Sequence, residues 1–447
     1  MDDHMRLCAE FHVDILMRLL LLICIGFLNL SLLPAHAAEL RLQENEVTHG
    51  RLPERLLSEQ VTVSPDGRRT AYVAQRGIRV VAVINGQEAK PYDWIVRGFV
   101  GFTSDSKHVI YQVRRGPKML TVIDGVEAKE YDSVDNWVCS PAGSRVGYIA
   151  KRGPKYLAVI DGVEGKEYDN VRIAALSHSG RTAIIAEIAG KDCLVVDGVD
   201  GRLYQRIVDA KMSPDGKRLA FRAQRNENSA FMVIDGLPGN AYPAVEPAEF
   251  SLDSSRVGYA AGLETARTLV VDAAEITPPT GKFSQGPVFS PDAKRLAYVV
   301  SKEGDTAAVV LDQTPGKPYD SVTQLRFSPD GKRLAYVATK ATRNMLVIDG
   351  AEIGQYDAIT PDTLAFSPDS QHLACIARRG DEEFVVLDGA ESKPYDRILI
   401  GDTLRFADDG SIHVVAVRDR LVTRQREDGP ARIHQRDLFA LQLRLAE

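Results

Sequence analysis

Short runs of apolar residues recur along the chain, and each is bounded by residues typical of turns. In the copy around Ser328, the turn text Ser-Pro-Asp-Gly precedes an alternating run at residues 333–337, which indicates a strand. A further apolar run, residues 345–348, leads into Asp349-Gly350, a dipeptide typical of a two-residue β-hairpin. With the short apolar segments before Ser328 and after Gly350, one copy predicts four short antiparallel strands.

The same text recurs ten times along the chain. The residue in the Ser position is found, at steps of 36 to 40 residues, at Ser64, Thr103, Ser140, Ser177, Ser213, Ser251, Ser290, Ser328, Ser367 and Ala407. A fixed period near 40 residues indicates a propeller or a repeat array, and four-stranded antiparallel meanders are propeller blades. The sequence therefore predicts an all-β fold, a β-propeller of ten four-stranded repeats of about 38 residues each.

Ten copies exceed the four to eight blades that one propeller usually has. The chain is therefore expected to form either two rings or one unusually large ring. The sixth copy is the most divergent, because residues 277–281 replace its Tyr-Asp text. We place a boundary there, which gives an N-terminal segment at 38–60, repeats one to six at 61–276, repeats seven to ten at 287–436 and a C-terminal tail at 437–447.

Residues 1–37 have the pattern of a secretory signal peptide. Arg18 precedes an apolar run at residues 19–33, and Ala35-His36-Ala37 is a small-residue cleavage motif. Because residues 1–16 carry four acidic side chains, translation is expected to begin at Met17. The sequence thus predicts a periplasmic or secreted protein, cleaved after Ala37, with no transmembrane segment in the mature chain.

The charge and cysteine content of the chain indicate which kinds of binding partner and cofactor to expect. The formal net charge is −6, and it becomes −4 when the four acids and two bases of residues 1–37 are removed. Such a mild balance gives no general attraction to nucleic acid or to a membrane. Cys139, Cys193 and Cys375 stand where other copies place apolar side chains, so we expect free buried thiols. No Cys/His cluster indicates a metal, and no cofactor is predicted.

The text F-S-P-D-G-K-x-L-A-Y resembles the repeat of TolB-like propellers. It is almost intact at residues 64–72, 213–221, 290–298, 328–336 and 367–375. The resemblance covers nearly the whole mature chain and implies a periplasmic, non-catalytic binding propeller that works with envelope partners. One departure is that this family usually adds an α/β N-terminal domain to a six-bladed ring, whereas residues 38–60 are too short for one.

The repeated polar residues indicate structural roles in the blades rather than catalytic or metal-binding roles. A ring of turn aspartates (Asp66, Asp215, Asp292, Asp330 and Asp369) could bind a metal or transfer protons, but Asp at the third position of a tight turn serves the turn itself. Histidine replaces the arginine that follows most of these turns at His108 and His372, where a surface strand residue is the simplest interpretation. No nucleophile motif of the form G-x-S-x-G occurs, so no catalytic residue is predicted.

The loops between the second and third strands are basic in blades one to three. The candidate binding residues are Arg76, Arg114, Arg115, Lys118, Lys151, Arg152 and Lys155. In a meander these loops share one face, and the glutamates of the D-G-x-E text are expected on the other face, so net charge would conceal a basic patch. A solvated surface of mixed charge is the alternative. As a binding face, the patch suits an acidic protein or an anionic envelope polymer.

Three functions remain open at this point. The first is an exported, non-catalytic propeller that serves as a protein-binding scaffold in the cell envelope. The second is an enzyme or lectin-like binder that acts on envelope glycans or peptides, with its site in the central channel. The third is a structural repeat protein of the envelope. Because one fold hosts many functions, the fold alone does not choose between them.

Overall fold

In the computed structural model each repeat folds into one antiparallel sheet, and the described residues form ten such sheets. The structure describes residues 42–51, 61–263, 267–302, 306–401, 403–426 and 429–445. The predicted signal peptide lies outside these residues. These residues form no helix, and therefore no helix long and apolar enough to cross a membrane. The prediction of an all-β propeller with four-stranded blades is confirmed.

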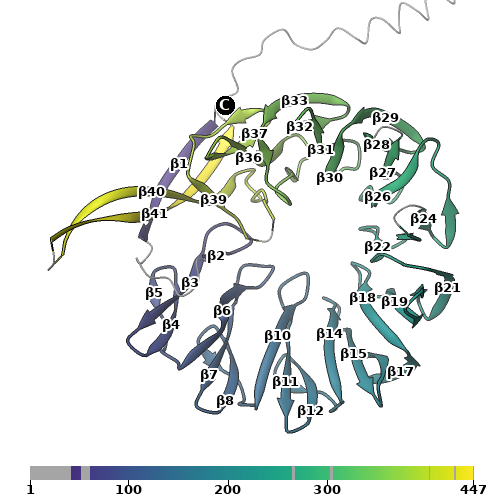
Figure 1. Cartoon of the computed structure of the whole chain (residues 1–447), viewed down its shortest axis with the longest axis horizontal. Coiled ribbons are helices and arrows are strands. Elements are labelled where there is room, and N and C mark those ends of the chain that lie inside the picture. The colour runs from purple at the N-terminus through teal and green to yellow at the C-terminus, as the bar shows by residue number, and fades with distance from the viewer. Residues whose placement is uncertain are drawn as a thin grey trace, which may run out of the picture. The chain divides into compact units, whose positions relative to one another are not determined.

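The strands of each blade follow one another from the channel to the rim (Figure 1). Blades one to three comprise β2 (Thr62–Val63), β3 (Thr70–Arg76), β4 (Arg79–Ile84) and β5 (Gln87–Glu88); β6 (Trp94–Phe102), β7 (Val109–Arg115), β8 (Lys118–Ile123) and β9 (Val126–Glu127); β10 (Ser133–Cys139), β11 (Val146–Arg152), β12 (Lys155–Ile160) and β13 (Val163–Glu164). Blades four to six comprise β14 (Asn170–Leu176), β15 (Thr182–Ile188), β16 (Lys191–Val196) and β17 (Val199–Tyr204); β18 (Arg206–Met212), β19 (Leu219–Asn226), β20 (Ser229–Ile234) and β21 (Leu237–Tyr242); β22 (Glu249–Phe250), β23 (Val257–Ala261), β24 (Thr268–Val271) and β25 (Ala274–Ile276).

The last four blades follow the same plan, with two variations. Blades seven and eight comprise β26 (Lys282–Phe289), β27 (Leu296–Lys302), β28 (Thr306–Leu311) and β29 (Thr314–Tyr319); β30 (Ser321–Phe327), β31 (Leu334–Lys340), β32 (Arg343–Ile348) and β33 (Ala351–Tyr356). Blade nine has a divided inner strand and comprises β34 (Ala358–Ile359), β35 (Ala365–Phe366), β36 (Leu373–Arg379), β37 (Glu382–Leu387) and β38 (Ala390–Glu391). Blade ten comprises β39 (Arg397–Leu399), β40 (Ile412–Arg426), β41 (Gly429–Leu445) and, from the start of the described chain, β1 (Leu42–Arg51).

The core lies between neighbouring blades. An apolar cluster joins each blade to the next; for example, Val73 of blade one packs in the same cluster as Tyr111 of blade two. The tenth blade also packs against the first, because Val63 shares a cluster with Val415 and Leu438. Of the two arrangements left open by the repeats, the described chain therefore forms the single ten-bladed ring (Figure 1).

The expected boundary at residues 277–287 falls between blades six and seven. Across it, Leu269 and Val271 pack in one cluster with Phe283 and Tyr298, so the two blades share a core like any other pair. The outer strand of blade six, β25, is only three residues long.

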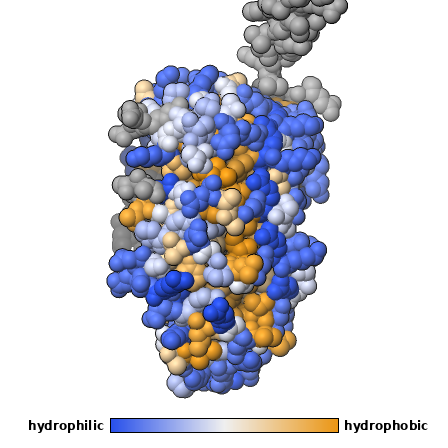
Figure 2. Space-filling view, turned by 90° about the vertical axis from the view of Figure 1, so that its right-hand side faces the viewer, coloured by the Kyte–Doolittle hydropathy of each residue, from blue (hydrophilic) through white to orange (hydrophobic). Residues whose placement is uncertain are grey.

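Figure 2 shows the rim of the molecule on the side of β21, β24 and β29, where hydrophobic residues form a band between hydrophilic ones.

The two ends of the chain differ from the expected segments outside the repeats. Residues 42–51 form β1, which pairs antiparallel with β41 and completes blade ten, and residues 437–445 are the end of β41 itself. The physical reason is closure of the ring: a blade that takes strands from both ends of the described chain fastens those ends together. A strand from one end of the chain therefore pairs with the strand at the other.

Turn residues behave as the repeats predicted. Asp349 and Gly350 have φ values of 52° and 83°, the pair of positive values that a type I′ hairpin turn requires. The three cysteines in the described ranges are free, with Cys193 and Cys375 buried and Cys139 half-buried. Burial raises the pKa of the Cys375 thiol, so this group is an inert part of the core.

Candidate functional site

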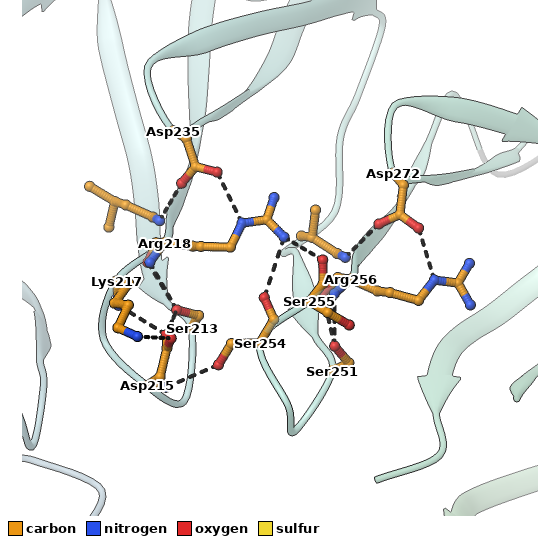
Figure 3. A network of polar contacts seen from close by, with 12 residues as sticks. Ser213, Asp215, Lys217, Arg218, Asp235, Ser251, Ser254, Ser255, Arg256 and Asp272 are labelled. Atoms are coloured by element: carbon orange, nitrogen blue, oxygen red, sulfur yellow. Dashed lines mark hydrogen bonds and ion pairs between the residues drawn. The ribbon is translucent and has the colours of Figure 1, made fainter. Parts of the chain in front are cut away.

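The repeated Ser and Asp residues build the tight turn that joins the first and second strands of a blade. In blade five the Ser213 hydroxyl donates to Asp215 at 2.6 Å, and Asp215 accepts the Lys217 N–H at 3.0 Å (Figure 3). The Arg218 N–H donates back to the Ser213 oxygen at 2.9 Å. The bonds from Ser213 and from the Lys217 N–H lower the pKa of Asp215 to about 2. The aspartate is thus occupied by its own turn.

The arginine after this turn joins one blade to the next. Arg218 Nε donates to Asp235 at 3.0 Å within blade five, and its Nη1 donates to the Ser255 carbonyl of blade six at 2.8 Å (Figure 3). Its guanidinium also lies over the Phe250 ring, with its carbon 5.5 Å from the ring centroid. Cation–π contacts are made within about 6 Å. Equivalent links to the following blade are made by Arg69, Arg145, Arg181, Arg256, Arg295 and Arg333.

The two histidines that replace this arginine make only half of its contacts. His108 Nδ1 lies 2.6 Å from Asp124 Oδ2, and His372 Nδ1 lies 2.6 Å from Asp388 Oδ2, so each keeps the bond to its own blade. Neither ring bonds to the following blade within the described residues, because imidazole is shorter than an arginine side chain and lacks its fork of donors. The junctions of blades two with three and nine with ten therefore lack this link.

The Tyr and Glu of the repeat form a second set of links near the rim. The Tyr92 hydroxyl donates to Glu127 of the next blade at 2.8 Å, and Tyr131 donates to Glu164 in the same way. Further copies of this contact are Tyr168 with Asp200, Tyr242 with Glu275, Tyr319 with Glu352 and Tyr395 with Glu44. The Tyr-Asp and D-G-x-E texts thus serve contacts between blades.

Five of the seven predicted basic residues lie in ion pairs. Arg76 pairs with Glu88, Arg115 with Glu127 and Glu130, Arg152 with Glu164 and Glu167, Lys118 with Asp132, and Lys155 with Asp169. The Lys118 and Lys155 ion pairs are 2.6 Å long, and about half of each lysine side chain is exposed. These cations are therefore paired within the ring's own contacts.

The expectation that the repeat glutamates lie on the opposite face is wrong for these copies. Glu88 of β5 forms an ion pair with Arg76, the last residue of β3, and Glu127 of β9 forms one with Arg115, the last residue of β7. Arg114 is exposed, and its side chain has no ion pair or hydrogen bond within the described part of the chain. Lys151 lies 5.2 Å from the Tyr156 ring. The structure thus leaves Arg114 and Lys151 as the members of the set without a carboxylate bound.

A pocket that the sequence did not indicate lies on the channel wall. It has a volume of about 810 Å³ and is formed where the inner strands of blades six to eight and the segment before β35 meet the turn prolines Pro214 and Pro291. Its wall is mixed, with apolar residues such as Phe250, Leu252 and Phe289 beside polar ones such as Glu249, Gln285 and Gln324. Leu252 is 67% exposed, which leaves a large apolar side chain open to solvent.

Irregular inner strands shape this pocket. The pairing of β26 with β27 shifts register between Gln285 and Val288, and that of β30 with β31 shifts between Thr323 and Arg326. Such bulges re-aim side chains, and alternation along the strand does not reveal them. Gln324, with a φ of 54°, donates to the Thr360 carbonyl at 3.1 Å and so ties the bulge to blade nine.

The polar side of the pocket carries opposite charges. Burial lowers the pKa of Arg326, and the nearby Asp362 carboxylate partly opposes this effect. Both residues line the pocket beside the apolar wall. No group of three or more His, Cys, Asp or Glu side chains in the described ranges is arranged to hold a metal ion. The site is thus a concave pocket lined by both apolar and charged side chains, and concave pockets are where ligands commonly bind.

Comparison with known proteins supports the resemblance that the repeats suggested. Residues 239–420 match the sequence profile of the lipoprotein LpqB β-propeller domain. The chain is a β-propeller, and this part of it is similar to that domain. No curated protein matches it.

Solved structures similar to this propeller include a eukaryotic initiation factor, which is 13% identical, with 68% of this chain and 90% of the other covered and a TM-score of 0.46. TolB from Acinetobacter baumannii is also 13% identical, with 64% and 78% covered and a TM-score of 0.27. Dihydro-heme d1 dehydrogenase NirN is 12% identical, with 78% and 77% covered and a TM-score of 0.37. At these values the likenesses carry no information on function.

Proposed function

We propose that the protein is an exported, non-catalytic propeller that binds a protein partner in the cell envelope. The observation that carries this proposal is the pocket on the channel wall, in which apolar side chains lie beside charged ones. Burying exposed apolar surface such as that of Leu252 would favour a complex. The Arg326 and Asp362 side chains would orient a bound segment through polar contacts.

Two further observations support a scaffold rather than an enzyme. The repeated aspartates and arginines, which offer most of the candidate chemistry, are engaged in turns and in links between blades. The match to the LpqB propeller domain includes the pocket strands β22, β26 and β30. Export rests on the signal-peptide pattern of residues 1–37.

Of the basic hairpin residues, the proposal keeps those that have no carboxylate bound as a second contact surface. Arg114 and Lys151 are available for an acidic partner or an anionic envelope polymer, whereas Arg115 and Arg152 would first have to leave their glutamates. Arg76, Lys118 and Lys155 are in the same position as Arg115. A second contact surface on blades two and three would therefore be centred on Arg114.

Affinity capture from an envelope extract tests the proposal. Residues 38–447 serve as bait beside the variant Leu252→Glu, which places a charge in the pocket at an exposed position. Leu237→Glu is the matched control, because Leu237 is 75% exposed on β21 and lies outside the pocket. Capture of a discrete protein by the parent chain and the control, but not by Leu252→Glu, supports the proposal. Equal capture by all three contradicts it.

A further inference from the structure

The strands β40 and β41 extend well beyond the blade to which they belong (Figure 1). They pair with each other as far as Arg426 and Gly429. Their neighbours stop earlier: β39 pairs with β40 only up to Val417, and β1 pairs with β41 only down to Asp437. Residues 420–426 and 429–435 therefore form a two-stranded arm that projects from the ring, and we refer to it as the arm.

The arm has two free edges within the described part of the chain. Its seven residue pairs, from Arg420 with Gln435 to Arg426 with Gly429, correspond to a length of about 24 Å at the usual rise per residue. A two-stranded ribbon without a covering layer is at best marginally stable in water, and its edges offer unpaired N–H and C=O groups. Elsewhere in the described structure, the strands belong to sheets of four or more strands. The arm thus presents a template for an additional strand.

Composition indicates the chemistry of that strand. Residues 420–435 contain four arginines (Arg420, Arg424, Arg426 and Arg432) and two acids (Glu427 and Asp428), a formal charge of +2 in a chain whose total is −6. Arg420 and Arg432 are exposed, and Leu421 is 56% exposed. A strand that carries both acidic and apolar side chains complements this surface in charge and in hydrophobicity.

Two other occupants fit less well. A second copy of the arm would bring arginines against arginines, and like charges on adjacent strands are destabilising. A membrane would meet the arginines favourably, but the free backbone groups could not enter the hydrocarbon layer without a large cost. An extended protein segment satisfies both the edges and the charges.

We propose that the arm, residues 420–426 and 429–435, binds an extended acidic segment of a partner protein by strand addition. The segment adds to a free edge of the arm through backbone hydrogen bonds, while its carboxylates face the exposed arginines. This inference rests on the proposed scaffold function and names the chemistry of its partner. The arm lies outside the channel-wall pocket, so the two sites can be tested separately.

The direct test uses a fluorescent ten-residue peptide of alternating glutamate and valine, with blocked ends, and residues 38–447 of the protein. Fluorescence anisotropy is expected to show binding that weakens as salt increases. A peptide of alternating lysine and valine should not bind. The decisive probe is the glutamate–valine peptide with N-methyl groups on alternate residues, which removes the backbone donors of one edge. This peptide is expected to bind at least about tenfold more weakly.

Two variants locate the binding on the arm. The first replaces residues 421–434 with Asn-Gly, which closes the ribbon just outside the Arg420–Gln435 pair. The second, Arg420→Glu with Arg432→Glu, keeps the arm and reverses its exposed charges. Both should lose peptide binding while circular dichroism and thermal unfolding remain those of the parent. If the shortened variant fails to fold, the charge-reversed variant alone decides.

The outcomes separate this proposal from the function on which it rests. Absence of peptide binding, equal binding by both variants, or equal binding of the N-methylated peptide overturns the arm proposal. If capture from the envelope extract still depends on Leu252 in any of these cases, the scaffold function stands and only the role of the arm fails. If capture is absent and the peptide binds in the arm-dependent way, the arm proposal stands and the pocket-based function fails.

Discussion

Arg418 donates two hydrogen bonds of 2.8 Å to the Glu46 carboxylate, from opposite ends of the described chain. The same guanidinium lies over the rings of Tyr395 and Phe439, at 4.8 and 4.7 Å. This contact fastens β1 to blade ten and so helps to close the ring. Burial alone would raise the pKa of Glu46, but the bonds from Arg418 and Tyr395 outweigh it and hold that pKa below its usual value.

Removing the Glu46 charge should weaken the ring at its closure. We expect Glu46→Gln to lower the free energy of unfolding by about 1–3 kcal/mol, since a charge-assisted bidentate bond is lost. Urea unfolding measures this. The control is Glu88→Gln, whose ion pair with Arg76 is about half exposed and should change stability by less than about 0.5 kcal/mol. Equal effects of the two substitutions would contradict the closing role.

Acid should destabilise the links between blades. The pKa of Glu127 is lowered to about 2, first by Lys90 and then by Tyr92, and that of Glu164 is lowered to about 2 chiefly by Arg152. A lowered folded-state pKa gives stability that is present above the unfolded value near 4.5 and is lost as the pH falls towards 2. We expect the urea midpoint to decrease over that range, and less steeply in Glu127→Gln. A midpoint unchanged from pH 5 to pH 2.5 would refute this account.

The arginine link between blades is testable at Arg218. We expect Arg218→Ala to destabilise the protein by about 1–3 kcal/mol, because the Ser255 carbonyl and Asp235 both lose a donor. Lys217→Ala is the neighbouring control, since the Lys217 side chain is 82% exposed and should change stability by less than about 0.5 kcal/mol. Thermal unfolding of both variants provides the comparison. If Lys217→Ala costs as much, the link has no special role.

Restoring the missing arginine should stabilise the ring. His108→Arg would keep the bond to Asp124 and reach the Gly143 and Ser144 carbonyls of blade three, which correspond to Ser254 and Ser255. We expect a gain of about 0.5–1.5 kcal/mol, the usual net contribution of an added hydrogen bond. A rise in the unfolding temperature is the expected reading. A fall would show that this junction cannot accommodate the arginine.

The candidate basic residues divide into two classes with different expected effects. Arg114→Glu with Lys151→Glu should abolish capture of a partner that uses this face and leave stability within about 0.5 kcal/mol. Arg115→Gln with Arg152→Gln should instead lower stability, because Glu127 and Glu164 each lose a hydrogen-bond donor. Pull-down and urea unfolding are measured on both. If capture survives the first pair of substitutions, the patch takes no part in binding.

How much the sequence could predict depends on whether neighbours in space are also neighbours in the repeat. The hairpin at Asp349-Gly350 and the turn at Ser213 are local, so their text alone indicated them correctly. Closure by β1 could not be predicted, because its partner β41 lies at the other end of the chain and neither strand carries the repeat text. The ring count depended on that closure and stayed open for the same reason.

The candidate site was likewise predictable where it depends on local sequence and not where it depends on contacts between strands. The seven basic residues are visible in the sequence, but the carboxylates that pair with five of them lie on other strands or loops and become apparent only in the folded blade. The pocket depends on bulges near Gln285 and Gln324, which break the alternation on which strand prediction relies. Only the unusual length of the non-repeat text after Ile412 could have signalled the arm.

The central claim, that the pocket on the channel wall binds a protein partner, is tested most directly by site-specific photo-crosslinking. A photoreactive amino acid at position 252 lies in the pocket wall, and one at position 237 is equally accessible on the rim. In an envelope extract, the account predicts one discrete crosslinked protein from position 252 and none from position 237. The same crosslinks from both positions, or none from position 252, would contradict it.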